Sequence, residues 1–523
     1  MRLARQLFVL SRQGVLRPGR PDRVVRQVAS LLTWGAGIAG EIRQAAARSP
    51  DAVAVVDERR GEITYAALLA SSERALGVLL DHGVSAGDSV GVLCRNHLAL
   101  VELLGGASTA GIDVVLLNTG LVARQVAEVV EREQISFVVH DDEFTVLVAD
   151  LSVPSLTESG FTALLQESAP RRPIPPRRAG RVVVLTSGTT GPPKGARRPH
   201  PRSLSGLASV LDRIPLRPRE TVLLSAPIFH TWGFGGLQLA LAMRDTIVLQ
   251  RRFDPGSARS ALVEHHCQVM FAVPVMLQRM LALDTAPETC LRIVAVSGSS
   301  LPGGLATRFM TAYGPVLYNV YGSTEVSWAA IADPRDLMAA PACSGRPPHG
   351  TRVVIVSQDG TEAPAGQVGR VFVGNEMLFS GYTDGGTRER WHGLVDTGDL
   401  GHVEDGRLCL DGREDDLVVS GGENVHVGAV EDVISGMNQV REVTVFGVED
   451  EEFGQRLVAY VVPEPGVRLV AADVVRYVSS RVARHSRPRE VVVVERLPRN
   501  ETGKVLIREL RQQHGADLPR APE

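Results

Sequence analysis

The sequence predicts an α/β protein with a large N-terminal domain and a small α+β C-terminal domain. Its 523 residues exceed what a single hydrophobic core usually serves, so more than one domain is expected. From about residue 50, short β-branched runs alternate with helical patterns. After about residue 340, the chain changes to short strands broken by Gly, Pro and Asp. These observations indicate parallel sheets followed by smaller β-rich units.

A basic segment, residues 1–44, precedes the alternating pattern. Its apolar run "LFVL" is too short for a signal peptide. The segment is expected either to pack on the large domain or to contact anionic lipid as a basic amphipathic stretch. The apolar stretch "SLLTWGAGIAG", residues 30–40, comes just after the arginine-rich part and favours the first alternative. The first 26 residues hold one acid, Asp22, and seven arginines: Arg2, Arg5, Arg12, Arg17, Arg20, Arg23 and Arg26.

Two series of predicted strands make up the large domain. The first contains "AVAVVD", "SVGVLCRN" and "DVVLLN", separated by helical patterns. The second contains "FVVHDD", "RVVVLTS", "TVLLSAP", "TIVLQR", "VMFAVPV" and "RIVAVSGS". Strands that alternate with helices in this way imply parallel sheets built from βαβ units. The sequence therefore predicts two parallel-rich α/β subdomains.

The remainder of the chain reads as two smaller units. The stretches "TRVVIVSQDGTEAPAGQVGRVFVGN" and "GHVEDGRLCLDGRED" predict a small, mostly antiparallel β layer. Beyond Asp415, a mixed pattern predicts a compact module of about a hundred residues. The last residues, "RQQHGADLPRAPE", resemble a frayed tail.

Composition excludes several classes of protein. The 56 basic and 59 acidic side chains leave a net charge of −3, so neither a nucleic-acid binder nor a disordered chain is expected. No run reaches the roughly 18 apolar residues that a membrane helix needs.

The five cysteines are scattered and form no CxxC pair. This arrangement argues against a disulfide framework and a zinc site, and it favours a reducing, cytosolic compartment. In "EHHC", residues 264–267, neighbouring side chains on a helix would point in different directions. A helix end leading into a strand is predicted there, rather than a metal site.

The loop "LTSGTTGPPKGARR", residues 185–198, follows a predicted strand. It fails the Walker A pattern because Lys194 is followed by Gly195, and because Pro192 and Pro193 lack backbone N–H groups. Hydroxyls and glycine amides can still wrap a polyphosphate, with Lys194 as a counter-charge. The alternative is an ordinary surface turn.

Five motifs in order decide between these alternatives. "SGTTGPPKG" is followed by "YGSTE", "DTGDL", "GREDDLVVSGGENV" and "PRNETGK". This series resembles the adenylate-forming superfamily of acyl-CoA synthetases, luciferases and peptide-synthetase adenylation domains, over roughly residues 45–512. The resemblance implies a large domain at 45–412, a hinge at 413–416 around Asp415, a mobile C-terminal domain at 417–512 and a tail at 513–523.

The resemblance also implies a reaction in two steps. A carboxylate attacks the α-phosphorus of ATP to give an acyl-adenylate and pyrophosphate, and a thiol then attacks the acyl carbon as AMP leaves. ATP, Mg²⁺ and coenzyme A are the expected cofactor and co-substrates. Because each step brings negative charges together, fixed cationic and dipolar groups are expected at the site.

Individual roles follow by resemblance. Lys504 bridges the substrate carboxylate and the α-phosphate, Glu325 holds Mg²⁺, and Asp415 lies at the hinge. Thr186 and His230 are expected with Lys504 and Glu325 among the catalytic residues. The nucleotide-binding residues implied by the motifs are Thr186, Ser187, Gly188, Thr189, Thr190, Lys194, Gly298, Ser299, Tyr321, Gly322, Thr324, Asp399 and Arg413.

The acid to be activated is predicted from the motif "PIFHTWGF". Amino-acid-activating relatives carry an Asp there that pairs with the substrate ammonium, whereas this chain has His230. Apolar and small residues nearby suit a hydrocarbon tail, although "FAVPVM" could also be a plain core strand. The expected acyl pocket consists of His230, Trp232, Gly233, Val273 and Pro274.

The sequence therefore predicts a cytoplasmic acyl-CoA synthetase for a medium- or long-chain fatty acid. An acyl-AMP ligase that loads a carrier protein is one alternative, and a non-catalytic acyl or nucleotide sensor is another. No nucleic-acid partner is expected, and peripheral membrane contact through the basic arm stays open.

Overall fold

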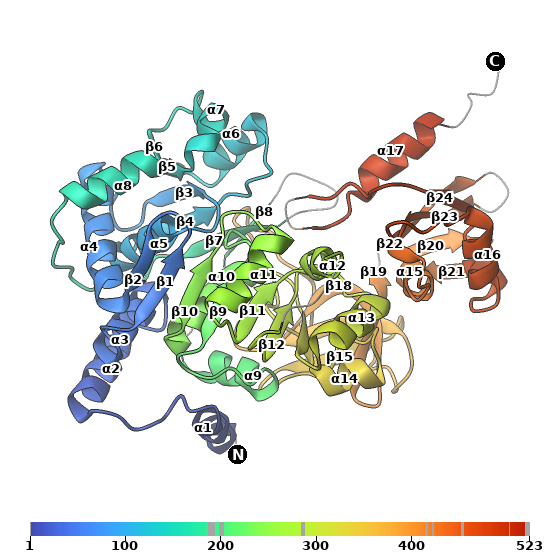
Figure 1. Cartoon of the computed structure of the whole chain (residues 1–523), viewed down its shortest axis with the longest axis horizontal. Coiled ribbons are helices and arrows are strands. Elements are labelled where there is room, and N and C mark those ends of the chain that lie inside the picture. Colours follow the sequence, from blue (N-terminus) through green and yellow to red (C-terminus); the bar gives the residue numbers. More distant parts are fainter. Residues whose placement is uncertain are drawn as a thin grey trace.

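The computed structural model describes residues 2–186, 194–197, 203–283, 288–413, 417–420, 423–450, 454–500 and 503–517. It confirms the predicted α/β class, with a large body and a smaller C-terminal domain that lies to one side (Figure 1). The described residues form four sheets.

A six-stranded sheet, order β6-β5-β3-β4-β7-β8, forms the first half of the large domain. Neighbouring strands are parallel except for β7 and β8. Its strands are β3 (Ser89–Leu93), β4 (Asp113–Leu116), β5 (Ile135–His140), β6 (Ser155–Thr157), β7 (Val182–Thr186) and β8 (Lys194–Arg197). The accompanying helices are α4 (Tyr65–Asp81), α5 (Leu98–Ala110), α6 (Ala123–Arg132), η1 (Asp142–Phe144), α7 (Thr145–Val148) and α8 (Glu158–Glu167).

An eight-stranded sheet, order β14-β13-β12-β11-β9-β10-β1-β2, forms the second half. Its inner strands are parallel and almost wholly apolar, as expected for a sheet buried on both faces. The strands are β1 (Val53–Asp57), β2 (Gly61–Thr64), β9 (Thr221–Leu224), β10 (Thr246–Leu249), β11 (Val269–Ala272), β12 (Ile293–Val296), β13 (Leu317–Tyr321) and β14 (Ala330–Ala332). The helices are α9 (Ser205–Arg213), α10 (Thr231–Met243), α11 (Pro255–Glu264), α12 (Pro274–Leu281), α13 (Gly303–Tyr313) and α14 (Pro334–Ala339).

The two halves do not follow sequence order as the two series of predicted strands suggested. β1, from the first series, pairs with β10 in the eight-stranded sheet. β5 and β7, from the second series, lie in the six-stranded sheet beside β3 and β4. The chain therefore crosses between the two sheets more than once.

The antiparallel β layer is present as predicted, and one of its features corrects the cysteine argument. Cys343 and Cys409 form a disulfide, whereas Cys94, Cys267 and Cys290 are free. The disulfide joins the segment after α14 to β19, so the expectation that the cysteines stay unpaired is wrong. The layer comprises β15 (Arg352–Val356), β16 (Gly369–Gly374), β17 (Arg390–Trp391), β18 (Leu394–Glu404) and β19 (Arg407–Arg413).

The C-terminal domain has its own sheet, order β21-β20-β23-β22, with β24 beside β23. Helices α15 and α16 pack on it through a core of Val, Ile and Leu side chains. Its elements are β20 (Leu417–Ser420), β21 (Glu423–His426), α15 (Val427–Ser435), β22 (Val440–Asp450), β23 (Gly454–Pro463), α16 (Ala471–Ser479), η3 (Arg484–Ser486), β24 (Glu490–Val493) and α17 (Ile507–Asp517).

The basic N-terminal segment forms three helices, α1 (Arg2–Arg12), α2 (Pro21–Trp34) and α3 (Ile38–Arg48). α1 packs on α9 through buried Val9 and Leu10, and Arg5 pairs with Asp212 at 3.2 Å. α3 is buried along most of its length and contacts α4, α5 and α10. The segment is therefore attached to the large domain, as the packing alternative predicted.

Two smaller expectations concern single segments. α11 ends at Glu264, His265 caps it and Cys267 is buried just before β11, so "EHHC" is a helix end as predicted. A separate expectation concerned membrane helices. Within the described residues, no helix is both long and apolar enough to span a bilayer.

Candidate active site

A cavity of about 720 Å³ lies at the carboxyl ends of the parallel strands of the eight-stranded sheet. Each strand contributes the residues that closely follow it: Ala226 and Pro227 after β9, Val273 after β11, and Ser297 and Gly298 after β12. Open parallel sheets bind their ligands at this edge. The motifs that follow parallel strands of this sheet therefore converge on one cavity.

Helix α10 forms one long wall of the cavity. Thr231, Gly235, Gln238 and Ala242 are three or four positions apart, so they share one side of the helix. Gly233 is buried, and a Cβ there would lie 2.1 Å from the carbonyl oxygen of Pro227. The absence of a side chain therefore lets the first turn of α10 lie close to the segment after β9. The lining residues from α10 are Thr231, Trp232, Gly233, Gly235, Gln238, Leu239 and Ala242.

His230 lies at the N-terminus of this helix and also lines the cavity. Burial, with a smaller contribution from the Lys504 ammonium, lowers the pKa of His230 to about 3. Its buried Nε2 has no hydrogen-bond partner among the described residues. The imidazole is therefore neutral and leaves a polar atom available at the cavity wall.

A carboxylate lies opposite, in the turn that follows β13. Glu325 is buried, and the hydroxyl of Tyr382 donates a hydrogen bond to its Oε1 at 2.5 Å. Burial and this hydrogen bond raise the pKa of Tyr382 to about 12, so the phenol stays protonated as a donor. Arg388 donates to the Tyr382 hydroxyl at 3.2 Å and lies 4.0 Å from Glu325. Glu325 is thus held in one position.

Asp399 lies between two partners from neighbouring segments. The Tyr321 hydroxyl donates to its Oδ2 at 2.6 Å, and Arg413 Nε donates to its Oδ1 at 3.2 Å. β18 and β19 pair with Asp399 directly opposite Arg413. Burial, followed by the Asp399 charge, raises the pKa of Tyr321 well above its usual value. The three residues predicted from separate motifs therefore form one hydrogen-bonded group.

Lys504 reaches the cavity from the C-terminal domain. The preceding residue, Gly503, has a φ of +81°, and a Cβ there would lie 2.3 Å from Cγ1 of Val275 on α12. Asn500 fixes the turn, since its Oδ1 accepts the Lys504 N–H at 2.9 Å and its own N–H donates to the Lys504 carbonyl at 2.9 Å. Only glycine fits this close approach in the left-handed region.

The structure brings together many of the predicted residues. Lys194 lines the cavity mouth, and its Nζ lies 3.2 Å from Asp384. The predicted residues that line the cavity are Lys194, His230, Trp232, Gly233, Val273, Gly298, Gly322, Thr324, Glu325, Arg413 and Lys504. Tyr321 and Asp399 do not line the cavity themselves, but Asp399 accepts hydrogen bonds from Tyr321 and from the lining residue Arg413. Ser299 and Pro274 are not among the lining residues.

Some predicted residues cannot be placed. Ser187, Gly188, Thr189 and Thr190 of the loop, and Asp415 of the hinge, lie outside the described residues. Thr186 ends β7, but its side chain is outside the described part as well.

Sequence reasoning missed several lining residues. Tyr382, Arg388 and Trp328 belong to no motif that the sequence singled out, and Glu41 was assigned to the N-terminal arm. The Gly-rich turn around Tyr382 gave no local sign that this ring would contact Glu325. A tertiary contact of this kind leaves no periodic pattern in the sequence.

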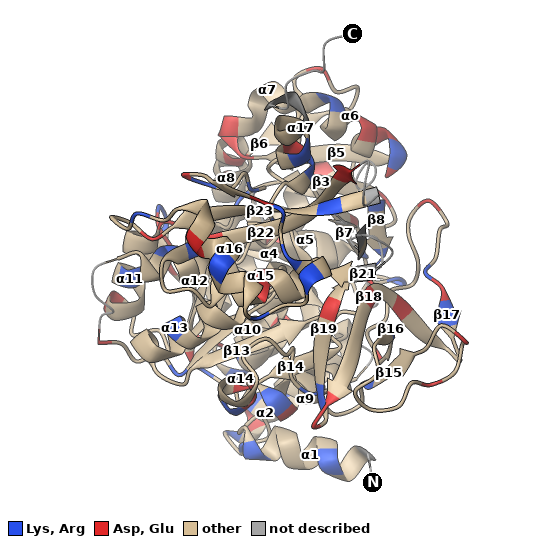
Figure 2. Ribbon diagram, turned by 90° about the vertical axis from the view of Figure 1, so that its right-hand side faces the viewer, with Lys and Arg blue, Asp and Glu red and all other residues tan. Residues whose placement is uncertain are grey.

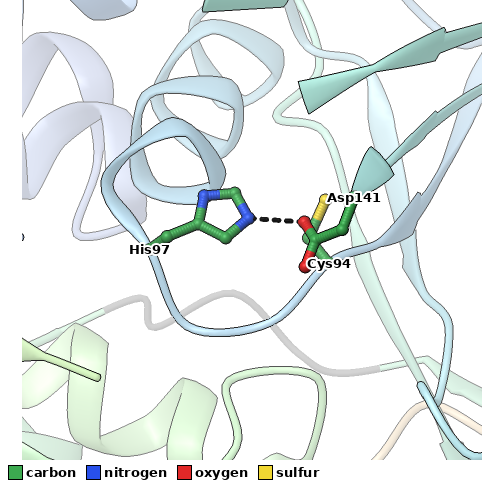
Figure 3. A group of neighbouring side chains, drawn as sticks. All are labelled: Cys94, His97 and Asp141. Carbon is green, nitrogen blue, oxygen red and sulfur yellow. Dashed lines mark hydrogen bonds and ion pairs between the residues drawn. The ribbon is translucent and has the colours of Figure 1, made fainter. Parts of the chain in front are cut away.

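A second cluster of chemically versatile side chains lies apart from the cavity (Figure 3). His97 Nε2 donates to Asp141 Oδ1 at 2.7 Å, and its Nδ1 accepts the Leu100 N–H in the first turn of α5. Burial raises the pKa of the Cys94 thiol well above its usual value. Each group already has a protein partner and the thiol keeps its proton, so the cluster anchors α5 to the end of β5.

Comparisons with known proteins identify the family of this chain. The family model of the AMP-binding enzymes matches residues 42–383, and the model of the AMP-binding enzyme C-terminal domain matches residues 429–504. The chain belongs to the AMP-binding enzyme family. It is an acyl-CoA ligase of this family, a class that forms an acyl-AMP intermediate.

Relatives along nearly the whole chain act on different acids. A feruloyl-CoA synthase from an Amycolatopsis species is 30% identical over 483 residues, covering 89% of this chain and 97% of the relative. The long-chain-fatty-acid–CoA ligase FadD13 of Mycobacterium tuberculosis is 28% identical, covering 92% and 99%. Among solved structures, ATP-bound MatB from Rhodopseudomonas palustris has a TM-score of 0.82 at 25% identity, covering 91% and 99%.

Proposed function

We propose that this AMP-binding family member is an ATP-dependent ligase that activates a medium- or long-chain fatty acid and transfers it to coenzyme A. The observation that carries the proposal is the cavity along α10, which holds Lys504 and Glu325 near the start of the helix and has apolar lining residues such as Leu207, Val210 and Leu239. A hydrocarbon tail gains about 0.8 kcal/mol for each methylene buried in such a channel.

In the first step, a carboxylate oxygen attacks the α-phosphorus of ATP and pyrophosphate leaves. Lys504 is the proposed bridge between the two anions, since it lies at the cavity mouth and its charge reaches His230. Asp399, Arg413 and Tyr321 are proposed to hold the ribose, because a carboxylate flanked by two donors retains lone pairs for further hydroxyls. Gly298, Gly322 and Thr324 are proposed to border the nucleotide.

The proposed polyphosphate loop runs from Thr186 to Lys194. Its described end, Lys194, is exposed beside Asp384 at the cavity mouth, where an incoming anion can compete for the ammonium. The roles of Ser187, Gly188, Thr189 and Thr190 remain proposals from the motif.

Mg²⁺ fits the residues around Glu325. Mg²⁺ is usually held by one or two carboxylates together with substrate phosphates and waters. Glu325 offers one buried carboxylate that Tyr382 orients, and the Thr324 hydroxyl is nearby on the same turn. The bound ion would neutralise phosphate charge, while Tyr382 and Arg388 keep the carboxylate aimed at it.

In the second step, a thiol attacks the acyl carbon and AMP leaves. Rotation of the C-terminal domain about Asp415 is proposed to remove Lys504 and admit coenzyme A. Coenzyme A is preferred over a carrier protein because the feruloyl and long-chain-fatty-acid relatives are CoA ligases.

The acid is proposed to lack an α-ammonium group. His230 stands where a counter-ion would be needed, and its low pKa makes it neutral at pH 7. A buried neutral imidazole cannot offset the charge of an ammonium group. Fatty acids are therefore favoured over amino acids.

The proposed location is the cytoplasm, with peripheral contact to anionic membrane through α1 and α2. α1 buries Val9 and Leu10 on one side, and both helices also expose apolar residues. Basic positions lie along both helices (Figure 2). Apolar side chains beside basic ones are the pattern of interfacial helices. The exposed apolar residues of the two helices are Leu3, Leu7, Phe8, Val25, Val28 and Leu32, and Leu16 between the helices is exposed as well.

The first prediction separates the two half-reactions. Lys504→Ala should reduce acyl-adenylate formation about 10²-fold or more, the scale expected when one preorganised charge is lost. The same variant, given prepared acyl-AMP and coenzyme A, should form thioester at nearly the wild-type rate. Pyrophosphate release and thioester chromatography measure the two steps. Equal loss in both steps would contradict the proposed role of Lys504.

A second test changes the position of Lys504 through the glycine that precedes it, and leaves the lysine charge in place. Gly503→Ala should impair adenylation in the same selective way, because the new Cβ meets Val275. Val275→Ala in the same chain should restore part of the activity by removing the contacted Cγ1. Gly466→Ala is the matched control, since Gly466 also has a positive φ, +74°, but a Cβ there would meet nothing within 4 Å.

A further prediction concerns chain length. A Cβ at Gly235 would meet no atom within 4 Å, so a larger side chain there projects into the cavity. Gly235→Phe should lower kcat/KM for long-chain acids about 10²-fold by excluding about four methylenes, worth about 3 kcal/mol. Butyric acid should be activated as before, and Gly235→Ala should resemble the wild type. An equal loss for short and long acids would place the tail elsewhere.

The membrane contact predicts sedimentation with vesicles. Wild-type protein should sediment with vesicles that contain phosphatidylserine, and less so at high salt, which screens the arginines. Replacing Leu3, Phe8 and Leu32 with Ser should abolish sedimentation and leave activity on butyric acid unchanged, because these side chains are exposed. Wild-type protein that stays in the supernatant at low salt would refute the contact.

A further inference from the structure

The cavity ends on a buried carboxyl group. Glu41, on α3, lines the cavity together with Ala36 and is only 6% exposed. Purely hydrocarbon substrates would be served by an apolar end wall, because burying a polar group without a partner costs free energy. If the protein activates a carboxylic acid as proposed, the polar group at this end of the cavity helps to determine which acid binds.

The position of Glu41 follows from how α3 is attached to α10. Gln44 Nε2 donates to the carbonyl oxygens of Leu241 and Ala242 at 3.2 and 3.3 Å, at the C-terminal turn of α10. The same amide donates to Glu41 Oε2 at 3.1 Å. Gln27 on α2 donates in turn to Gln44 Oε1 at 2.7 Å. The carboxyl group is thus fixed beside the last turn of α10.

This position is the far end of the channel. The opposite end of α10 lies at Thr231, whose hydroxyl donates to the Thr324 hydroxyl at 3.2 Å, next to Glu325. From Thr231 to Ala242 the helix rises about 16 Å. A substrate whose carboxylate lies near Lys504 would therefore bring its other end to Glu41.

A second polar group lies on the same stretch of wall. Gln238 is four residues, or about one turn, before Ala242, so both lie on one side of α10. Its side chain lines the cavity and has no hydrogen-bond partner in the described part of the chain. The Gln238 amide, which can donate and accept hydrogen bonds, thus adds a second polar group to the cavity wall formed by this side of α10.

The charge state of Glu41 selects the kind of polar group. Burial raises the pKa of Glu41 to about 8, against smaller opposing effects of the Gln44 hydrogen bond and the Arg244 charge. No ion pair joins Glu41 to Arg244 within the described residues. At pH 7 the carboxyl group is therefore mostly protonated and can both donate and accept a hydrogen bond.

We propose that Glu41 and Gln238 form a polar end wall that binds a hydroxyl group at the distal end of the acid. The substrate class is then a carboxylic acid with a hydrocarbon body and an uncharged, hydrogen-bonding terminus. An unsubstituted tail would leave both side chains without a ligand partner, which weakens its binding relative to the hydroxy acid. The Gln27–Gln44 pair positions this wall and does not itself line the cavity.

The test compares dodecanoic acid with ω-hydroxydodecanoic acid by kcat/KM. The wild type should prefer the hydroxy acid about tenfold or more, as expected for one satisfied buried hydrogen bond. Glu41→Leu should reverse the preference, because the apolar terminus then meets an apolar wall. Glu41→Gln should keep it, since an amide also donates and accepts. Should Glu41→Leu fail to fold, Gln238→Leu provides the same comparison.

Controls and opposing outcomes separate this inference from the proposed function. Glu73→Gln removes the negative charge that pairs with Arg43 at 3.1 Å, outside the cavity, and should leave the ratio unchanged. Equal kcat/KM for both acids in the wild type would overturn the polar end wall and leave the fatty-acid proposal standing. No activation of either acid would instead refute the proposed function. Preference for ω-aminododecanoic acid over the hydroxy acid would overturn the choice of an uncharged group.

Discussion

The close approach of Gly503 to Val275 is the contact on which the proposed adenylation depends. Lys504 belongs to the C-terminal domain, yet it lines a cavity in the large domain, and it does so because residue 503 has no side chain. Other contacts across the domains are polar, such as the hydrogen bond from Arg308 to the Val440 oxygen at 3.3 Å and its ion pair with Glu464 at 3.9 Å. The two described hydrophobic clusters of the C-terminal domain contain only its own residues. Its rotation would therefore leave both cores intact.

Motifs that directly follow strands were predictable from the sequence. Glu325, Gly298 and Val273 meet at one cavity because each follows a parallel strand of one sheet, and those strand ends share an edge. Lys504 belongs to a motif in the C-terminal domain, and its expected position in the site was inferred from the family resemblance. The α/β class, the antiparallel layer and the attached N-terminal segment were likewise recoverable from patterning and composition.

Contacts between distant segments were not predictable. The partition of strands between the two sheets depends on tertiary packing, and the apolar sequence of β1 does not itself identify β10 as its neighbour. Cysteine spacing gave no sign of the Cys343–Cys409 disulfide, since β pairing of Gly345 with Leu408 brings the two residues together. Tyr382 and Glu41 reach the cavity from a loop and from the N-terminal segment. The family match begins at residue 42, so Glu41 lies just outside it.

The central claim, that this chain activates a fatty acid through acyl-AMP for transfer to coenzyme A, is tested most directly by mass spectrometry of its products. A panel of fatty, aromatic and amino acids would be incubated with ATP and Mg²⁺, with and without coenzyme A. The account predicts acyl-AMP from fatty acids when coenzyme A is absent and acyl-CoA when it is present, with no product from amino acids. Unconsumed ATP across the panel, or adenylates formed only from amino acids, would contradict it.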